Sequence, residues 1–229
     1  MKQLYQDIKN GKIILQEQPM PTCKDNHVLI HTSKTLISSG TERMLIDFGK
    51  SNYLNKAKKQ PDKLKMVLEK AKTDGILSTI DSVKAKLDQP MKMGYSNVGT
   101  VIEVGKNVQE FKVGDRVVSN GNHAEVVCVS KNLVSKIPNE VSDSEAVFTI
   151  VGAIALQGIR LAKPSIGEHF VVMGLGLIGL LTVQILKANG CDVLGFDFDS
   201  KKVEIAKSFG ISAYSLEDNN DPLVIAKKF

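Results

Sequence analysis

Short apolar runs, rich in β-branched residues, alternate with polar turn segments along most of the first 140 residues. Examples are IILQE, HVLIHTSKTLI, NVGTVIEV and HAEVVCVS, and Pro, Gly, Asn or Asp lies between successive runs. Runs of this kind, bounded by turn residues, are typical of strands in antiparallel sheets. The pattern predicts about six or seven short strands that form a barrel-like domain over residues 1–140.

Residues 47–92 interrupt the strand pattern with a helical one. Apolar residues recur at every third or fourth position from Leu64 to Ala71 and again from Ile76 to Leu87. This spacing predicts two amphipathic helices inserted in the β domain. The segment contains eleven lysines and six acidic residues, a difference that equals the net charge of +5 of the whole chain.

The lysines are explained most simply as a solvated helix face, and a basic rim for an anionic substrate or partner is the alternative. Because the excess charge does not lie in a groove-reading motif, we expect no nucleic-acid partner. No apolar run reaches the roughly 18 residues of a membrane span, and the first residues lack the apolar core of a signal peptide. We therefore expect a cytoplasmic protein without a membrane partner. The cysteines are expected to be reduced thiols, since they lie far apart at Cys23, Cys128 and Cys191.

After Pro138 the apolar period becomes helical, and helix and strand patterns then alternate. Ser142 and Glu145 have the spacing of a capping box, and apolar residues at helical spacing continue to Ala162. Three buried-strand patterns, each with a helical pattern after it, cover residues 169–174, 192–197 and 212–216. This order predicts a doubly wound parallel sheet over residues 141–229, and the chain as a whole belongs to the α/β class.

A G-x-G-x-x-G sequence lies directly after the first of these strands and at the start of a helix. In this context the first glycine permits a tight turn, the second lets a pyrophosphate approach the backbone, and the third lets the helix pack on the strand. N–H groups at the helix N-terminus then face the phosphates. The turn is predicted to bind a dinucleotide through Gly174, Leu175, Gly176, Leu177, Ile178 and Gly179.

An acidic residue, Asp197, ends the second strand, 23 residues after Gly174. A carboxylate at this place accepts hydrogen bonds from the adenosine ribose hydroxyls and repels a 2′-phosphate, so NAD is expected as the cofactor and NADP is disfavoured. Lys202, which follows Lys201, is expected to contact the same part of the cofactor. Lys202 weakens the expected preference for NAD over NADP, because a lysine can accommodate a 2′-phosphate.

The order of these parts resembles the medium-chain dehydrogenase/reductase superfamily. Its GroES-like barrel signature is similar to VGTVIEVGKNVQEFKVGDRV, and its cofactor unit is similar to VVMGLGLIGLLTVQILKANGCDVLGFDFDSKKVEIAKSFG. A bacterial subfamily of bi-domain oxidoreductases is similar in SSGTERM, the lysine-rich insert, QPMKMGYSNVG and GAIALQGIRLA. The resemblance implies a GroES-like barrel followed by a partial Rossmann domain, and the subfamily implies a role in cell-surface polysaccharide metabolism.

The zinc sites of the superfamily are not matched. By the resemblance, the three catalytic ligand positions fall on Ser39, Tyr95 and about Ile150, whereas Zn²⁺ binds thiolate, imidazole or carboxylate groups. Three scattered cysteines cannot form the four-cysteine structural site either. We therefore expect no zinc and no other metal.

Hydroxyl groups are then the candidates for stabilising a developing alkoxide. By the resemblance, Thr41 takes the position of the hydroxyl that relays the substrate proton, and Tyr95 takes that of a zinc histidine in the same cleft. We expect both to orient and protonate a substrate oxygen, with Ser39 and Glu42 behind them. Ordinary hydroxyls satisfied by the backbone are the alternative interpretation. No acid or cysteine spacing singles out a histidine, so structural or surface roles are expected for all four, including His123.

The Rossmann part comprises about three strands, whereas a complete dinucleotide fold has six. We therefore expect this polypeptide to be a fragment or to be completed by a partner chain. By itself it is expected to bind NAD weakly and to turn over little or no substrate. The resemblance implies that the missing part carries the nicotinamide side of the site and the dimer interface. The parent protein is accordingly expected to be a homo-oligomer.

Three functions are compatible with these features. The first is a zinc-independent, NAD-linked oxidoreductase that exchanges hydride with an alcohol or carbonyl of a small molecule, such as a sugar derivative. The second is a non-catalytic module that binds NAD or a partner. The third is a quinone-reductase-like enzyme that reduces activated alkenes with NADPH, which Asp197 disfavours.

Overall fold

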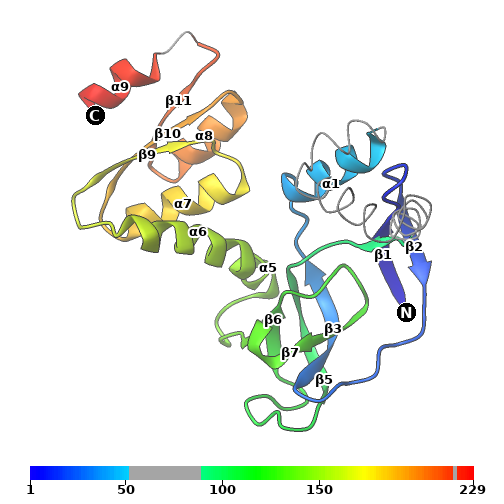
Figure 1. The fold of residues 1–229 in the computed structure, drawn as a ribbon. Coiled ribbons are helices and arrows are strands. Elements are labelled where there is room, and N and C mark those ends of the chain that lie inside the picture. The colour runs from blue at the N-terminus through cyan, green and yellow to red at the C-terminus, as the bar shows by residue number, and fades with distance from the viewer. Residues whose placement is uncertain (52–88, 219–220) are drawn as a thin grey trace, which may run out of the picture. The chain divides into compact units, whose positions relative to one another are not determined.

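The computed structural model describes residues 1–51, 89–218 and 221–229. Within these residues the chain divides into two compact units, Met1–Val147 and Phe148–Phe229. Figure 1 colours the first unit from blue to green and the second from yellow-green to red. The two helices predicted within the lysine-rich insert lie outside the described residues.

Two antiparallel sheets build the first unit, one with the strand order β2-β1-β4 and one with the order β7-β3-β5-β6-β8. A bridge between Gln3 and Ala124 joins β1 to the segment before β7. The strands are β1 (Lys2–Gln6), β2 (Ile13–Glu17), β3 (His27–Thr35), β4 (Met91–Lys92), β5 (Asn97–Val104), β6 (Arg116–Ser119), β7 (Val126–Ser130) and β8 (Val134–Lys136). The predicted antiparallel β domain is confirmed.

The core of this unit is made of β-branched side chains that project from the five-stranded sheet. Val28 and Ile30 of β3 pack with Val101 of β5 and Val117 of β6, and all four are fully buried. Each such side chain contributes about 1.5–3 kcal/mol by leaving water. Gly99 lets β5 approach β3, since a Cβ at this position would collide with the carbonyl oxygen of His31. Besides the short 3₁₀ helix η1 (Lys131–Leu133), the unit contains the helices α1 (Thr41–Lys50) and α5 (Asp143–Ala146).

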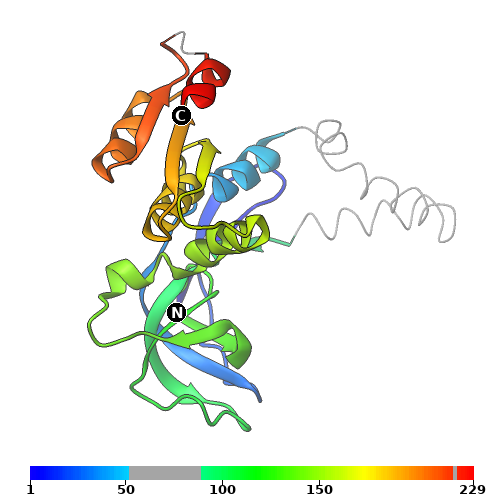
Figure 2. The ribbon, with the colours of Figure 1, turned by 90° about the vertical axis from the view of Figure 1, so that its left-hand side faces the viewer.

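The second unit is built on a parallel sheet with the strand order β11-β10-β9. Its strands are β9 (His169–Met173), β10 (Asp192–Asp197) and β11 (Ser212–Ser215), and its helices are α6 (Thr149–Ala162), α7 (Leu177–Ala188), α8 (Ser200–Ser208) and α9 (Pro222–Lys228). Helix α7 packs on β9 and β10, α8 packs on β10 and β11, and α6 packs on α7 (Figures 1 and 2). The predicted β-α-β-α-β order is confirmed.

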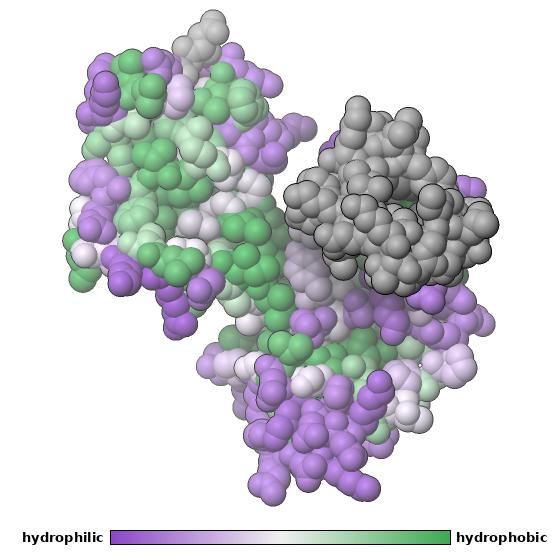
Figure 3. All heavy atoms as spheres, viewed as in Figure 1, coloured by the Kyte–Doolittle hydropathy of each residue, from purple (hydrophilic) through white to green (hydrophobic). Residues whose placement is uncertain are grey.

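A second hydrophobic core lies between this sheet and its helices. It includes Val183 and Leu186 of α7, Val193 of β10, Val203 of α8 and Ala213 of β11. Other apolar side chains of the unit are exposed, and Figure 3 shows apolar residues gathered over it. The exposed residues include Ile154, Leu161, Ile166 and Ile178. None of the helices in the described residues is long and apolar enough to cross a membrane.

The boundary between the units differs from the sequence prediction. The capping box of Ser142 and Glu145 is confirmed, but the helix that it starts ends at Ala146. Asp143 of this short helix accepts hydrogen bonds from Ser33 and Arg116, which belong to the strands of the first unit. The segment expected to open the second domain at residue 141 therefore packs with the first, and the second unit begins at Phe148.

Candidate functional site

The glycine turn of the second unit connects β9 to α7. Gly174 has a φ of +91°, a region that L side chains rarely adopt, and its N–H donates to the carbonyl oxygen of Phe196 at 2.7 Å. Gly179 lies in the first turn of α7, where a Cβ would collide with the carbonyl oxygen of Gly174. The strand, the turn and the helix can thus pack in this way only with glycine at both positions.

The surroundings of Gly176 differ from those of Gly174 and Gly179. It is the N-cap residue of α7, its φ is −70°, and no side chain caps the helix at this end. A Cβ on Gly176 would meet nothing within 4 Å. The space beside Gly176 at the N-terminus of α7 is therefore free of protein atoms, which leaves room for an anionic group such as a pyrophosphate.

Asp197 lies beside this turn at the end of β10, with its side chain 12% exposed. Its Oδ2 accepts a hydrogen bond from the N–H of Leu175 at 2.7 Å, and its Oδ1 accepts one from the N–H of Asp199 at 2.8 Å. Burial raises the pKa of the carboxyl, but the two backbone hydrogen bonds and the charge of Lys202 outweigh it, so the pKa lies below its ordinary value. The carboxylate keeps further lone pairs for ribose hydroxyls.

The other predicted cofactor residues take different places around the turn. Lys202 of α8 holds its Nζ 3.5 Å from Oδ1 of Asp197 and 3.8 Å from Oδ2 of Asp199. The side chain of Leu175 is fully buried, so it presents only its backbone to the site. Leu177 is half-buried and Ile178 is exposed. The structure thus brings the turn, Asp197 and Lys202 together.

The two predicted hydroxyl residues lie in the first unit. Thr41 is exposed and is the first residue of α1. Tyr95 is half-buried in the turn between β4 and β5. Ser39 is exposed, whereas Glu42 is buried.

Glu42 forms an ion-pair contact that the sequence analysis did not foresee. Its Oε2 lies 3.0 Å from Nε2 of His123, and both side chains are only 5% exposed. Its Oε1 accepts a hydrogen bond from the N–H of Ser38 at 2.8 Å. Because Glu42 and His123 are 81 residues apart in the chain, no local spacing pointed to the pair.

His123 in turn lies against the segment that carries Tyr95. A Cβ on Gly94 would lie 2.7 Å from three atoms of the imidazole ring, so the ring packs directly on the Gly94 backbone. The N–H of His123 donates to the carbonyl oxygen of Met93 at 2.8 Å. Asn122, the residue before it, donates from Nδ2 to the carbonyl oxygen of Gly94 at 2.6 Å. Nδ1 of His123 is buried and has no hydrogen-bond partner among the described residues.

The residues at the catalytic zinc positions do not form a zinc site. Ser39 and Tyr95 carry hydroxyls and Ile150 is apolar, so the set lacks the thiolate, imidazole and carboxylate ligands that Zn²⁺ binds. Over the described ranges, no three His, Cys, Asp or Glu side chains come close enough to hold a metal ion.

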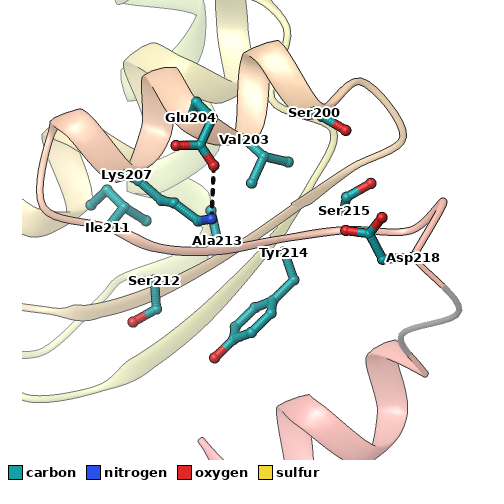
Figure 4. Close-up of a pocket in the computed structure, with 10 residues that line it drawn as sticks. All are labelled: Ser200, Val203, Glu204, Lys207, Ile211, Ser212, Ala213, Tyr214, Ser215 and Asp218. Carbon is teal, nitrogen blue, oxygen red and sulfur yellow. Dashed lines mark hydrogen bonds and ion pairs between the residues drawn. The ribbon is translucent and has the colours of Figure 1, made fainter.

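Each unit has a hollow on its surface among the described residues. The first, of about 270 Å³, lies between α8 and β11 and contains the ion pair of Glu204 and Lys207, 2.8 Å long (Figure 4). None of its lining residues belongs to the glycine turn. The second is a groove of about 790 Å³ in the first unit, bordered by Tyr95. Its charged and titratable lining side chains are Lys24, His27, Lys92 and Cys128.

The antiparallel sheets of the first unit and the parallel sheet with a glycine turn of the second define an α/β fold with a GroES-like and a Rossmann-like part. The family model described as "Alcohol dehydrogenase GroES-like domain" matches residues 72–139. The match covers less than a third of the chain.

Curated relatives match about half of the chain. (R,R)-butanediol dehydrogenase of Bacillus subtilis is 30% identical over 149 residues, which cover 53% of this chain and 43% of that protein. D-guloside 3-dehydrogenase of Escherichia coli is 33% identical over 123 residues, which cover 52% of this chain and 35% of that protein. The matched regions thus span less than half the length of these relatives.

Solved structures share the fold over nearly the whole chain. The structure of 2R,3R-butanediol dehydrogenase from Bacillus subtilis has a TM-score of 0.74 at 21% identity, and the match covers 99% of this chain and 67% of that one. Quinone oxidoreductase of Escherichia coli, complexed with NADPH, has a TM-score of 0.71 at 17% identity and covers 96% of this chain and 60% of that one.

Proposed function

We propose that the chain is the barrel and cofactor-binding part of a zinc-independent, NAD-linked oxidoreductase that acts on an alcohol or carbonyl of a small polar molecule. The open glycine turn with Asp197 beside it carries this proposal. The turn offers backbone N–H groups to a pyrophosphate, and Asp197 offers acceptors to the ribose hydroxyls.

A bound nicotinamide nucleotide would supply the hydride exchange. The chain's own residues bind and orient it and handle the proton. Gly176 and the N-terminus of α7 bind the phosphates, and Asp197 orients the ribose. In the direction of carbonyl reduction, the hydroxyls of Thr41 and Tyr95 donate hydrogen bonds to the substrate oxygen as its negative charge develops. One of them passes its proton to that oxygen and takes up another from solvent.

A sugar derivative fits the first unit best. The groove beside Tyr95 is lined by Lys24, Lys92 and His27 without a carboxylate, which favours a hydroxyl-rich or anionic ligand. D-guloside 3-dehydrogenase and D-xylulose reductase, both similar to this chain, are named for sugar substrates. A role in cell-surface polysaccharide metabolism and a homo-oligomeric parent stay predictions.

Gly176→Ala provides the sharpest test of cofactor binding. Its backbone suits alanine and its Cβ meets no protein atom, so the variant should fold with an unchanged melting temperature. The methyl group would occupy the space of the pyrophosphate, and calorimetric titration should show NADH affinity reduced at least about tenfold. Gly158→Ala in α6, where a Cβ also meets nothing within 4 Å, is the matched control. Equal NADH affinity of wild type and Gly176→Ala would contradict the assignment.

The choice of nucleotide is tested on Asp197. Wild-type protein should bind NADH at least about tenfold more tightly than NADPH, because the carboxylate repels a 2′-phosphate. Asp197→Asn keeps an oxygen for the Leu175 N–H but removes the charge. The variant should therefore show a smaller difference between its affinities for NADH and NADPH. Preference of the wild type for NADPH, together with alkene turnover, would support the quinone-reductase alternative instead.

Zinc and the hydroxyls are tested separately. Metal analysis by mass spectrometry should find less than stoichiometric zinc in protein purified without chelators. Turnover of sugar alcohols by the parent protein should fall at least about tenfold in Tyr95→Phe and in Thr41→Val. Stoichiometric zinc, or unchanged turnover in both variants, would remove the hydroxyl mechanism.

A further inference from the structure

We propose that Glu42 and His123 are positioning residues that set the Thr41 and Tyr95 hydroxyls for proton transfer with the substrate. The inference rests on the proposed function, since it concerns the same hydroxyls. His123 has no part in the chemistry described so far, and Glu42 has been placed only behind the two hydroxyls, although both are titratable side chains that are 5% exposed.

Glu42 controls the segment that carries Thr41. It is the second residue of α1, directly after Thr41, and its two carboxylate oxygens have two different partners. Oε1 accepts from the N–H of Ser38, while the N–H of Glu42 donates to the carbonyl oxygen of Ser38 at 2.9 Å. These two hydrogen bonds close the chain from Ser38 to Glu42 into one rigid turn. The direction of the Thr41 hydroxyl therefore depends on where the Glu42 carboxylate is held.

His123 controls the segment that carries Tyr95. Its ring packs on the backbone of Gly94, its own N–H is bonded to Met93, and Asn122 is bonded to the carbonyl of Gly94. Gly94 has a φ of +85°, which sets the direction in which the chain enters Tyr95. A shift of the imidazole would move this turn and the phenol that follows it.

The 3.0 Å contact between Glu42 and His123 is therefore a link between the two hydroxyl segments. A carboxylate only accepts, so Nε2 carries the hydrogen and the bond is directional. Two apolar side chains would fill the same space without the cost of removing polar groups from water. They would not, however, fix the orientation of one segment relative to the other as a hydrogen bond does. Nδ1 of His123 has no partner in the described residues, which is a further cost that packing alone does not explain.

Three substitutions of His123 separate positioning from packing. His123→Gln places an amide N–H near the Nε2 position, where it can still donate to Glu42. His123→Asn is polar but too short to reach, and His123→Leu is apolar. The asparagine variant keeps the test decisive if the leucine variant does not fold. Ser119→Ala is the control, because it also removes a buried polar group of this unit but has no contact with Glu42 or His123.

Steady-state kinetics of the parent protein with NAD(H) and the best sugar alcohol should show a split between kcat and KM. In the asparagine and leucine variants we expect kcat to fall at least about tenfold, with KM and NADH affinity within about threefold of wild type. The glutamine variant should recover kcat to within about threefold of wild type, and Ser119→Ala should keep it. Full kcat in the leucine or asparagine variant, or an equal loss in all three, would overturn the positioning role.

Hydrogen exchange of the full chain provides a readout that does not depend on turnover. The asparagine and leucine variants should exchange faster at the amides of both segments, residues 38–42 and 93–96, and the glutamine variant should not. Faster exchange at one segment only would show that the pair does not connect them. If wild type shows neither NADH binding nor turnover, the proposed function fails, and exchange still decides whether the pair links the two segments.

Discussion

Two glycines of the first unit, Gly94 and Gly114, share a left-handed backbone but differ in what surrounds them. Their φ angles are +85° and +92°. A Cβ on Gly94 would press on the His123 ring at 2.7 Å, whereas a Cβ on Gly114 would meet nothing within 4 Å. The pair therefore separates the cost of the backbone conformation from the cost of displacing His123.

Gly94→Ala should destabilise the first unit by about 2–4 kcal/mol, because the conformational cost and the displaced ring add together. Gly114→Ala should cost only the conformational part, about 1 kcal/mol. Urea unfolding, monitored by circular dichroism, measures the free energy of unfolding of the two variants. Equal losses in the two variants would mean that the His123 ring moves aside without cost.

The glycine turn between β9 and α7 could be predicted from the sequence, whereas the Glu42–His123 pair could not. Gly174, Gly176 and Gly179 lie within six residues, and their strand-turn-helix context is local. Glu42 and His123 are 81 residues apart in the chain and meet only in the folded first unit. The polar sequence around His123 suggests an exposed side chain, but His123 is buried. A single sequence contains no signal for such a contact.

At the scale of elements, the short helix α5 is held to the barrel by Asp143. Its carboxylate accepts from the Ser33 hydroxyl at 2.5 Å and from Nε and Nη2 of Arg116 at 3.2 and 2.5 Å. The hydrogen bond from Ser33, followed by the contacts with Arg116, holds the pKa of the carboxyl below its ordinary value of 3.8. The ionised form is thus favoured in the folded protein.

Asp143→Asn should lower the free energy of unfolding by about 1 kcal/mol at pH 7, a modest value because Arg116 is partly exposed. A group whose pKa is depressed by folding stabilises the protein above its unfolded pKa, and this contribution is lost as the pH falls through the folded pKa. The difference between wild type and variant should therefore be complete at pH 7 and shrink below about pH 4.

Urea titrations at pH 7, 5, 4 and 3 measure this dependence. Asp25→Asn is the control, since its carboxylate accepts no recorded hydrogen bond, and it should change stability by less than about 0.5 kcal/mol. A difference that grows toward acid pH would contradict the role given to Asp143.

The elements themselves were mostly predictable, and their exceptions have tertiary causes. The three parallel strands and the capping box at Ser142 follow from local period and spacing. The helix break after Ala146 does not, because apolar residues continue at helical spacing through Phe148. In the folded chain the Val147 carbonyl accepts a hydrogen bond from the buried Ser96 hydroxyl at 2.6 Å, which a local pattern cannot reveal.

At the scale of the whole molecule, each unit has its own hydrophobic core. We expect scanning calorimetry to show two transitions, of which saturating NADH raises only the one that belongs to the second unit. At a concentration of 100 times Kd, binding adds about 2.7 kcal/mol to the unit that binds the ligand. Gly179→Ala identifies that transition, because its Cβ collides with Gly174 and should lower it alone.

One cooperative transition that NADH raises as a whole would contradict this expectation. So would a downward shift of both transitions in Gly179→Ala by the same amount. Gly176→Ala is the control here too, since it should leave both transitions in place without ligand. At tenfold weaker affinity it should reduce the stabilisation by the same NADH concentration to about half or less.

The three glycines of the turn also differ in whether the protein would still fold after each is replaced during evolution. A lineage that replaced Gly179 or Gly174 would lose the packing of helix on strand, and selection would remove it as a misfolded product. Under the proposed function, a lineage that replaced Gly176 would keep a folded protein that no longer binds its nucleotide. Descendants that adopt a new role on this scaffold should therefore diverge first at Gly176, and a side chain there would mark the point at which the ancestral chemistry was abandoned.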